Sequence, residues 1–155
     1  MATASTRAWL QGALWFVAAA ALVALWWFPD AISRLRSAGQ PYAAADPSCD
    51  FAAGPCVARF PDGTEVSLQA SPQPAPSGEP VALQVVVIGD ATPAAVEIQG
   101  VEMAMGFLRL PLTADGDRWT ATANLPVCTT ERMQWKADVV LSDRVAGFIL
   151  WSTRT

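Results

Sequence analysis

The sequence predicts an all-β protein, a single β-sandwich of seven or eight strands behind one N-terminal membrane-spanning helix. Three observations support this prediction. An uncharged, apolar stretch of 21 residues lies near the N-terminus, at residues 8–28. Short runs of alternating apolar and polar residues, separated by turns that contain Gly and Pro, fill the C-terminal two thirds, as expected of β-strands. No stretch in that part shows the 3.6-residue period of an amphipathic helix.

Residues 8–28 are long enough to cross a bilayer, because a helix needs about 20 apolar residues to span the hydrocarbon core. Trp9 at one end, and Trp26 and Trp27 at the other, lie where tryptophan anchors a span at the membrane interface. A cleaved signal peptide is the alternative, but its apolar core is shorter and is followed by small residues. This run ends in Trp-Trp-Phe-Pro, so we predict an uncleaved anchor.

The predicted span divides the chain into a short cytoplasmic tail at residues 1–7 and a larger C-terminal part. Arginines lie on both sides of it, so the positive-inside rule does not fix the orientation. Residues 29–48 are interpreted as a juxtamembrane turn and a linker, because Ala, Gly and Pro dominate their second half. Residues 49–155 have the length of one domain and form the predicted sandwich.

The expected strands of this domain follow from local patterns. The valine-rich stretch from residue 81 to residue 88 is typical of a strand buried on both sides. Asp115-Gly116 predicts a tight hairpin turn. The Pro-rich residues 71–80 are interpreted as a crossing between the first strands. The expected strands are Glu65–Ala70, Val81–Ile88, Ala95–Ile98, Val101–Leu110, Arg118–Asn124, Met133–Leu141 and Val145–Trp151.

Charge and composition exclude several classes of function. From residue 46 onward the chain carries 7 basic and 13 acidic side chains, a net charge of −6. Nucleic-acid binding needs a basic surface, so we expect none. The chain has no histidine, which removes the commonest general base and metal ligand. No nucleophile elbow or phosphate-binding loop is present, and we predict that the protein is not an enzyme.

Three cysteines, Cys49, Cys56 and Cys128, lie in the predicted domain. Three pairings are possible, and each leaves one thiol over. Cys49 and Cys56 flank a short loop in which Gly-Pro makes a reversal easy. In an oxidising compartment we therefore favour a Cys49–Cys56 disulfide, with Cys128 free.

Sulfur is also supplied by methionine. Met103 and Met105 are two residues apart on an expected strand, so their side chains share a face. Thioethers with a nearby thiolate suit Cu(I), and Cys128 and Met133 are placed to complete such a site. The alternative is core packing: Val101, Met103, Met105 and Phe107 form one apolar stripe, and methionine often fills core gaps. The residues alone leave both interpretations open.

Four segments together resemble the core of the FixH-like and YtkA-like domains. They carry a Met-x-Met-Gly strand, a Gly-aromatic hairpin and a closing Trp strand, and the likeness covers roughly residues 81–141. The segments are Gly100–Gly106, Gly116–Ala121, Leu125–Cys128 and Met133–Trp135. The opening from Cys49 to Cys56 is similar to that of a poorly characterised proteobacterial subgroup of such anchored proteins.

This resemblance implies an immunoglobulin-like domain in the periplasm, anchored by a single span in a bacterial inner membrane. It also implies a role in copper supply to, or assembly of, a haem-copper oxidase. Two hypotheses follow. In the first, the domain is a Cu(I)-binding accessory protein with Met103, Met105, Cys128 and Met133 as candidate ligands. In the second, it binds no metal and is an interaction module or accessory subunit that docks on a membrane complex, with Met103 and Met105 buried among Val101, Trp119 and Trp135.

Overall fold

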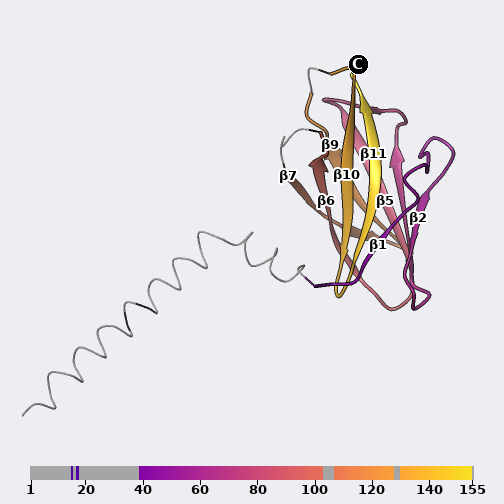
Figure 1. Ribbon diagram of the computed structural model, residues 1–155, viewed down its shortest axis with the longest axis vertical. Helices are drawn as coiled ribbons and strands as arrows, with labels where there is room; N and C mark the ends of the chain where they lie inside the picture. The colour runs from indigo at the N-terminus through magenta and orange to yellow at the C-terminus, as the bar shows by residue number, and fades with distance from the viewer. Residues whose placement is uncertain (1–14, 16, 18–38, 103–106, 128–129, 155) are drawn as a thin grey trace, which may run out of the picture. The chain divides into compact units, whose positions relative to one another are not determined.

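The computed structural model describes residues 15, 17, 39–102, 107–127 and 130–154 (Figure 1). The chain divides into two compact units, residues 1–39 and residues 40–155. The second unit contains all eleven strands of the described residues. It is an all-β sandwich of two sheets, as the sequence predicts.

In the first unit the structure describes Trp15 and Val17, which are helical and exposed, and Gly39, which lies in a turn. No helix among the described residues is long and apolar enough to cross a membrane. The rest of the predicted span lies outside the described residues, together with Trp9, Trp26 and Trp27. The membrane-spanning helix therefore stays a prediction.

Two sheets make up the sandwich. The first has the order β1-β11-β10-β6-β7, and β4 also pairs with β11. Its strands are β1 (Tyr42–Ala44), β4 (Ala75–Pro76), β6 (Pro93–Gly100), β7 (Phe107–Pro111), β10 (Arg132–Leu141) and β11 (Val145–Thr153). The second has the order β2-β3-β5-β9-β8. Its strands are β2 (Cys56–Arg59), β3 (Glu65–Ser71), β5 (Pro80–Ile88), β8 (Thr113–Asp115) and β9 (Arg118–Asn124).

Alternation of side chains along each strand places the core between the sheets. On β10 the inward residues are Met133, Trp135, Ala137 and Val139, all nearly or fully buried. Trp135 is the largest of the fully buried side chains. Its indole N–H donates to Ser152 Oγ on β11 at 2.8 Å, so the polar end of the ring has a partner inside the core.

Two predicted connections are confirmed. Asp115 pairs with Arg118 across the β8–β9 hairpin, and Gly116 has a φ of 64°, a value that favours glycine. The Pro-rich residues 71–80 do link the first long strands. They also contribute β4, which pairs with the opposite sheet before the chain returns in β5.

The prediction of a linker that reaches residue 48 is wrong in part. Tyr42–Ala44 form β1, which runs parallel to the start of β11, with Tyr42 opposite Val145. Ala43 and Ala45 are buried, and the Ala45 amide donates to the Gly147 carbonyl at 2.8 Å. Alanines are small enough to lie against the sheet, but a three-residue strand is too short to show periodicity in the sequence.

The prediction that β5 is buried on both sides is also wrong. Val81, Leu83 and Val85 are fully buried, whereas Val86 and Ile88 are exposed. The outer face of this antiparallel sheet has no covering layer among the described residues, so only alternate side chains reach the core. Valine is common here because β-branched residues suit the pleated backbone on either face.

The expected strand Val101–Leu110 is not continuous. β6 ends at Gly100, Val101 and Glu102 lie in a bend, and β7 begins at Phe107. Val101 and Phe107 are 51% and 44% exposed, so the described ends of the apolar stripe are not core residues. Residues 103–106, with Met103 and Met105, lie outside the described residues.

The sandwich has two ends that differ in their connections. At the "disulfide end" lie the described residues 49–55, 71–79, 101–102, 125–127, 130–131 and 154. At the "arginine end" lie residues 60–64, 89–92 and 142–144, next to residue 41, whose carbonyl accepts from the Val145 amide. Figure 1 shows the C-terminus at the top of the sandwich and the β10–β11 hairpin at the bottom. The ten residues of β10 separate the two ends by about 30 Å.

Candidate functional site

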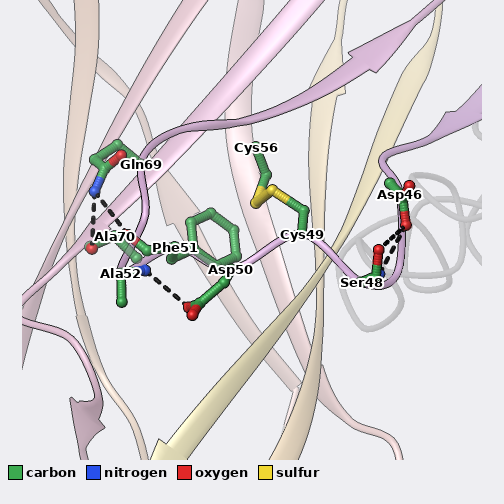
Figure 2. Close-up of a disulfide and its surroundings, with 9 residues drawn as sticks. All are labelled: Asp46, Ser48, Cys49, Asp50, Phe51, Ala52, Cys56, Gln69 and Ala70. Carbon is green, nitrogen blue, oxygen red and sulfur yellow. Dashed lines mark hydrogen bonds between the residues drawn. A yellow bond between two sulfur atoms is a disulfide. The ribbon is translucent and has the colours of Figure 1, made fainter.

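The predicted disulfide is present. Cys49 and Cys56 are joined by an S–S bond of 2.05 Å (Figure 2). Cys56 opens β2 and is buried, whereas Cys49 is only partly buried. The bond closes the loop at residues 49–55 against the sandwich, and of the chain's three cysteines it leaves Cys128, which lies outside the described residues.

The disulfide loop is held by more than its covalent bond. The Phe51 ring is 4% exposed and packs in the core. The Gln69 side-chain amide on β3 donates to the Phe51 carbonyl at 3.3 Å. Inside the loop, Asp50 Oδ1 accepts from the Ala52 amide at 2.9 Å. Figure 2 shows these residues around the bond; the loop is a packed part of the domain.

The four candidate copper ligands are not all described. Met133 is on β10 and 1% exposed, and its side chain belongs to the hydrophobic core. It faces the interior because it alternates with Arg132 and Gln134 along the strand. Met103, Met105 and Cys128 lie outside the described residues.

The described neighbours of these sulfur residues lie at the same end of the sandwich, the disulfide end. The Val101 amide donates to the Gln134 carbonyl at 3.0 Å, which brings the chain after β6 beside the start of β10. Val101, Phe107 and Val127 are all exposed, at 51%, 44% and 61%. The chain segments that lead into Met103–Met105 and Cys128 thus carry exposed apolar residues.

The two tryptophans that the core-packing hypothesis places beside the methionines differ in burial. Trp135 is buried at 1% exposure, while Trp119 is half-buried at the side of the core. Val101, the third expected neighbour of the methionines, is exposed. In the described parts of the chain, no group of three or more His, Cys, Asp or Glu side chains is arranged to hold a metal ion.

A cluster that the sequence did not predict lies at the arginine end. Arg144 forms ion pairs with Asp62 and Asp143, and its guanidinium donates to Thr64 Oγ1 at 3.0 Å. The guanidinium also lies 5.1 Å from the centre of the Phe60 ring. These contacts join two hairpin loops that are about eighty residues apart in sequence. No local pattern records such a pairing.

Electrostatics at this end follow from the same contacts. The hydrogen bond from Arg144, with one from the Thr64 amide, lowers the pKa of Asp62 from its ordinary value of 3.8 to about 2. The pKa of Asp143 is lowered mainly by its own hydrogen bond with Arg144. Both carboxylates and the guanidinium are therefore charged at neutral pH. A pocket of about 310 Å³ lies here, and three of its charged lining residues, Asp62, Asp143 and Arg144, already pair with one another.

β1 is fixed by a second unpredicted cluster. Lys136 pairs with Asp138 at 2.9 Å, and the Tyr42 hydroxyl donates to the same carboxylate at 3.5 Å. Burial and the negative charge of Asp138 raise the pKa of Tyr42. Gly147 lies beneath the Tyr42 hydroxyl, and a Cβ there would come within 1.8 Å of that oxygen. Glycine is thus required for the close approach.

Comparisons with known proteins give no family for this chain. The sequence matches no protein-family model and no curated protein. Among solved structures, one similar chain is an engineered protein from the Northeast Structural Genomics Consortium, with 18% identity and a TM-score of 0.38 over 57% of this chain and 20% of that one. Another is a DUF4785 family protein from Legionella pneumophila, with 10% identity and a TM-score of 0.35 over 58% of this chain and 29% of that one. This chain aligns with less than a third of either, and neither likeness bears on its function.

Proposed function

We propose that the protein is a membrane-anchored, periplasmic, non-catalytic accessory protein that carries Cu(I) at the disulfide end of its sandwich. Copper is its cargo, destined for a haem-copper oxidase or its assembly, as the FixH-like resemblance implies. The observation that supports this best is the exposure of Val101 and Phe107 on either side of the Met-x-Met segment. A stripe that packed into the core would bury both.

An immunoglobulin-like fold for the sandwich is part of the same proposal. In strand order β3-β5-β9-β8 and β11-β10-β6-β7, the two sheets have the connectivity of A-B-E-D and G-F-C-C′ in an immunoglobulin-type sandwich. β4 fits this scheme as well, because it lies between the first two of these strands in sequence and pairs in parallel with the last. β1 and β2 are additions to that plan.

The compartment is inferred from the disulfide and the predicted anchor. Disulfides persist in oxidising compartments such as the bacterial periplasm, and Cys49 is joined to Cys56. With residues 8–28 in the inner membrane, the C-terminal unit would then be periplasmic. The chain enters the sandwich at the arginine end, beside Val145, and the proposed cargo site lies at the other end of the strands.

The donor set fits Cu(I) with one revision. Thioethers and a thiolate are soft ligands that favour Cu(I), and the chain offers no imidazole. Met103, Met105 and Cys128 would hold the ion. Met133 does not fit, because its side chain is part of the hydrophobic core beside Trp135. We therefore omit it from the proposed ligands.

An anaerobic Cu(I) titration of the full-length protein in detergent, against a competing chelator, tests the proposal. Wild type should bind one equivalent of Cu(I). The Cu(I) affinity of Met103→Leu/Met105→Leu should be at least about tenfold lower, a loss of about 1.4 kcal/mol in binding free energy. Met133→Leu is the matched control: it also replaces a thioether by a similar volume, and it should bind as wild type does. Failure of the folded wild type to compete with the chelator would refute copper binding, and equal competition by all three folded proteins would exclude Met103 and Met105 as ligands.

A metal-free interaction module is the second candidate. It is favoured by the exposed apolar side chains of Val101, Phe107 and Val127, since exposed apolar groups that gather at one end mark contact surfaces. In that case the domain docks on a membrane complex without carrying an ion. Cross-linking from position 127 in membranes, with copper chelated, distinguishes the two candidate functions. A metal-free interaction module should still be cross-linked to its partner under these conditions.

A further inference from the structure

A pocket lies beside the disulfide, at the disulfide end of the sandwich. Its volume is about 300 Å³, and it is open to solvent. The disulfide loop forms one wall, the crossing that leads into β4 forms another, and the ends of β10 and β11 supply the rest. The lining residues are Cys49, Asp50, Phe51, Ala52, Gln73, Pro74, Arg132, Trp151 and Thr153.

Arg132 and Trp151 stand on the outer face of the first sheet. Their neighbours Met133 and Ser152 are buried inside, so alternation turns Arg132 and Trp151 outward. The guanidinium lies over the indole, 4.2 Å from the ring centre. A guanidinium in contact with an aromatic face keeps N–H donors available for a second partner. Arg132 therefore brings a positive charge and N–H donors to the pocket.

Arg132 differs from most of the basic residues of the domain. Five others each form an ion pair with a carboxylate: Arg59, Arg109, Arg118, Lys136 and Arg144. Arg132 forms no ion pair or side-chain hydrogen bond with any residue that the structure describes. Acidic side chains outnumber basic ones by 13 to 7 from residue 46 onward, so carboxylates are plentiful. The charge of Arg132 is left available for a ligand.

The remaining walls favour an apolar group next to the anion. Pro74, Trp151 and the disulfide-bonded Cys49 are apolar lining residues, and Thr153 is a lining residue with a hydroxyl group. Asp50 would repel an anion placed next to it, but its Oδ1 already accepts from the Ala52 amide. The ligand carboxylate is therefore directed to the Arg132 side of the pocket.

We propose that this pocket binds an acidic side chain, together with an adjacent apolar one, on an extended segment of a partner protein. The carboxylate accepts two parallel hydrogen bonds from Arg132, a geometry that guanidinium matches well. The apolar neighbour lies against Trp151 and Pro74. The proposal goes beyond copper binding, because it assigns a recognition site for the partner and uses none of the copper ligands.

A blocked peptide is the probe. Acetyl-Leu-Glu-Leu-amide and its Gln counterpart are titrated into full-length, ¹⁵N-labelled protein in detergent, and the indole N–H of Trp151 is followed by NMR. The Trp151→Phe variant assigns that signal. The Glu peptide should shift it saturably and bind about three- to fivefold more tightly than the Gln peptide, the range expected of one solvent-exposed ion pair. Arg132→Gln should remove the difference between the peptides.

Arg59→Gln is the matched control, because Arg59 is an exposed arginine on the other sheet; this variant should keep the preference for Glu. The Trp135 indole signal reports on the core and shows that each variant is folded. Equal binding of the two peptides to wild type, or an unchanged preference in Arg132→Gln, would overturn the proposal. So would a Trp151 shift with inorganic phosphate and none with either peptide. All of these results are independent of copper.

Discussion

Different kinds of interaction stabilise the two ends of the sandwich. At the disulfide end the connections depend on a covalent bond, the buried Phe51 ring and the hydrogen bond between Trp135 and Ser152 inside the core. At the arginine end they depend on charged groups near solvent, with Arg144 at the centre. The first set is insensitive to pH and salt, whereas the second responds to both. The end that carries the proposed binding sites is the one whose stabilising contacts do not depend on pH or salt.

Removing the disulfide should have the largest effect. Cys49→Ala/Cys56→Ala is expected to lower the free energy of unfolding by about 2–3 kcal/mol, the chain-entropy value for a loop this short. Urea denaturation of the full-length protein in detergent measures it. Cu(I) affinity should be unchanged, since neither cysteine is a proposed ligand. A loss below about 1 kcal/mol would mean that Phe51 and Gln69 hold the loop without the bond.

Ser152→Ala is expected to cost about 1–2 kcal/mol, because it leaves the buried Trp135 N–H without an acceptor. The same substitution in a Trp135→Phe background should cost less, since no indole N–H is then present to be left unpaired. Urea unfolding of the two single variants and the double variant gives this difference. Equal costs in both backgrounds would show that the hydrogen bond contributes little to stability.

The smallest expected effect is at the other end, and it depends on pH. The pKa of Asp62 is about 2 when folded and 3.8 ordinarily. Because the folded value is lower, the pair with Arg144 stabilises the protein above about pH 4, and this contribution is lost as pH falls towards 2. Arg144→Gln should therefore be less stable than wild type at pH 7 and nearly equal to it at pH 2. Thermal melts across this range measure the difference.

Arg118→Gln provides the control for that comparison. Arg118 pairs with Asp117 at 3.5 Å, and both side chains are well exposed. Its replacement should give melting curves close to wild type at every pH. If both variants showed the same pH dependence, the contacts of Arg144 with Asp62 and Thr64 would not be responsible for it.

Much of the fold could be predicted because its strands are local patterns. The alternation through Met133, Trp135 and Ala137 indicates both the strand and its buried face, and Asp115-Gly116 indicates the turn before Arg118. The Cys49–Cys56 bond was also predictable, since its two residues flank a loop with an easy reversal. β1, β4 and β8 are two or three residues long, and such strands carry too few positions for a period to be recognised.

What the sequence could not provide are contacts between distant segments. Arg144 and Asp62 are 82 residues apart, and the position of Arg132 over Trp151 depends on how β10 pairs with β11. The apolar stripe at Val101 and Phe107 misled the prediction for another reason. Its alternation is that of a strand, but the ladder with β10 ends at Gly100, opposite Trp135. A pattern of side chains does not show where a neighbouring strand stops.

The parallel pairing of β1 with β11 also determines how the domain responds to mechanical load. Suppose that residue 40 is pulled while a partner grips the disulfide end. The force then runs along both strands and loads their contacts in shear, so that the backbone bonds around residues 42–45 must break together rather than one after another. The Tyr42 side chain, seated on Gly147 beside Asp138, adds resistance at the same place. The three-residue strand β1 is thereby the first part of the sandwich to bear tension from the chain that precedes it.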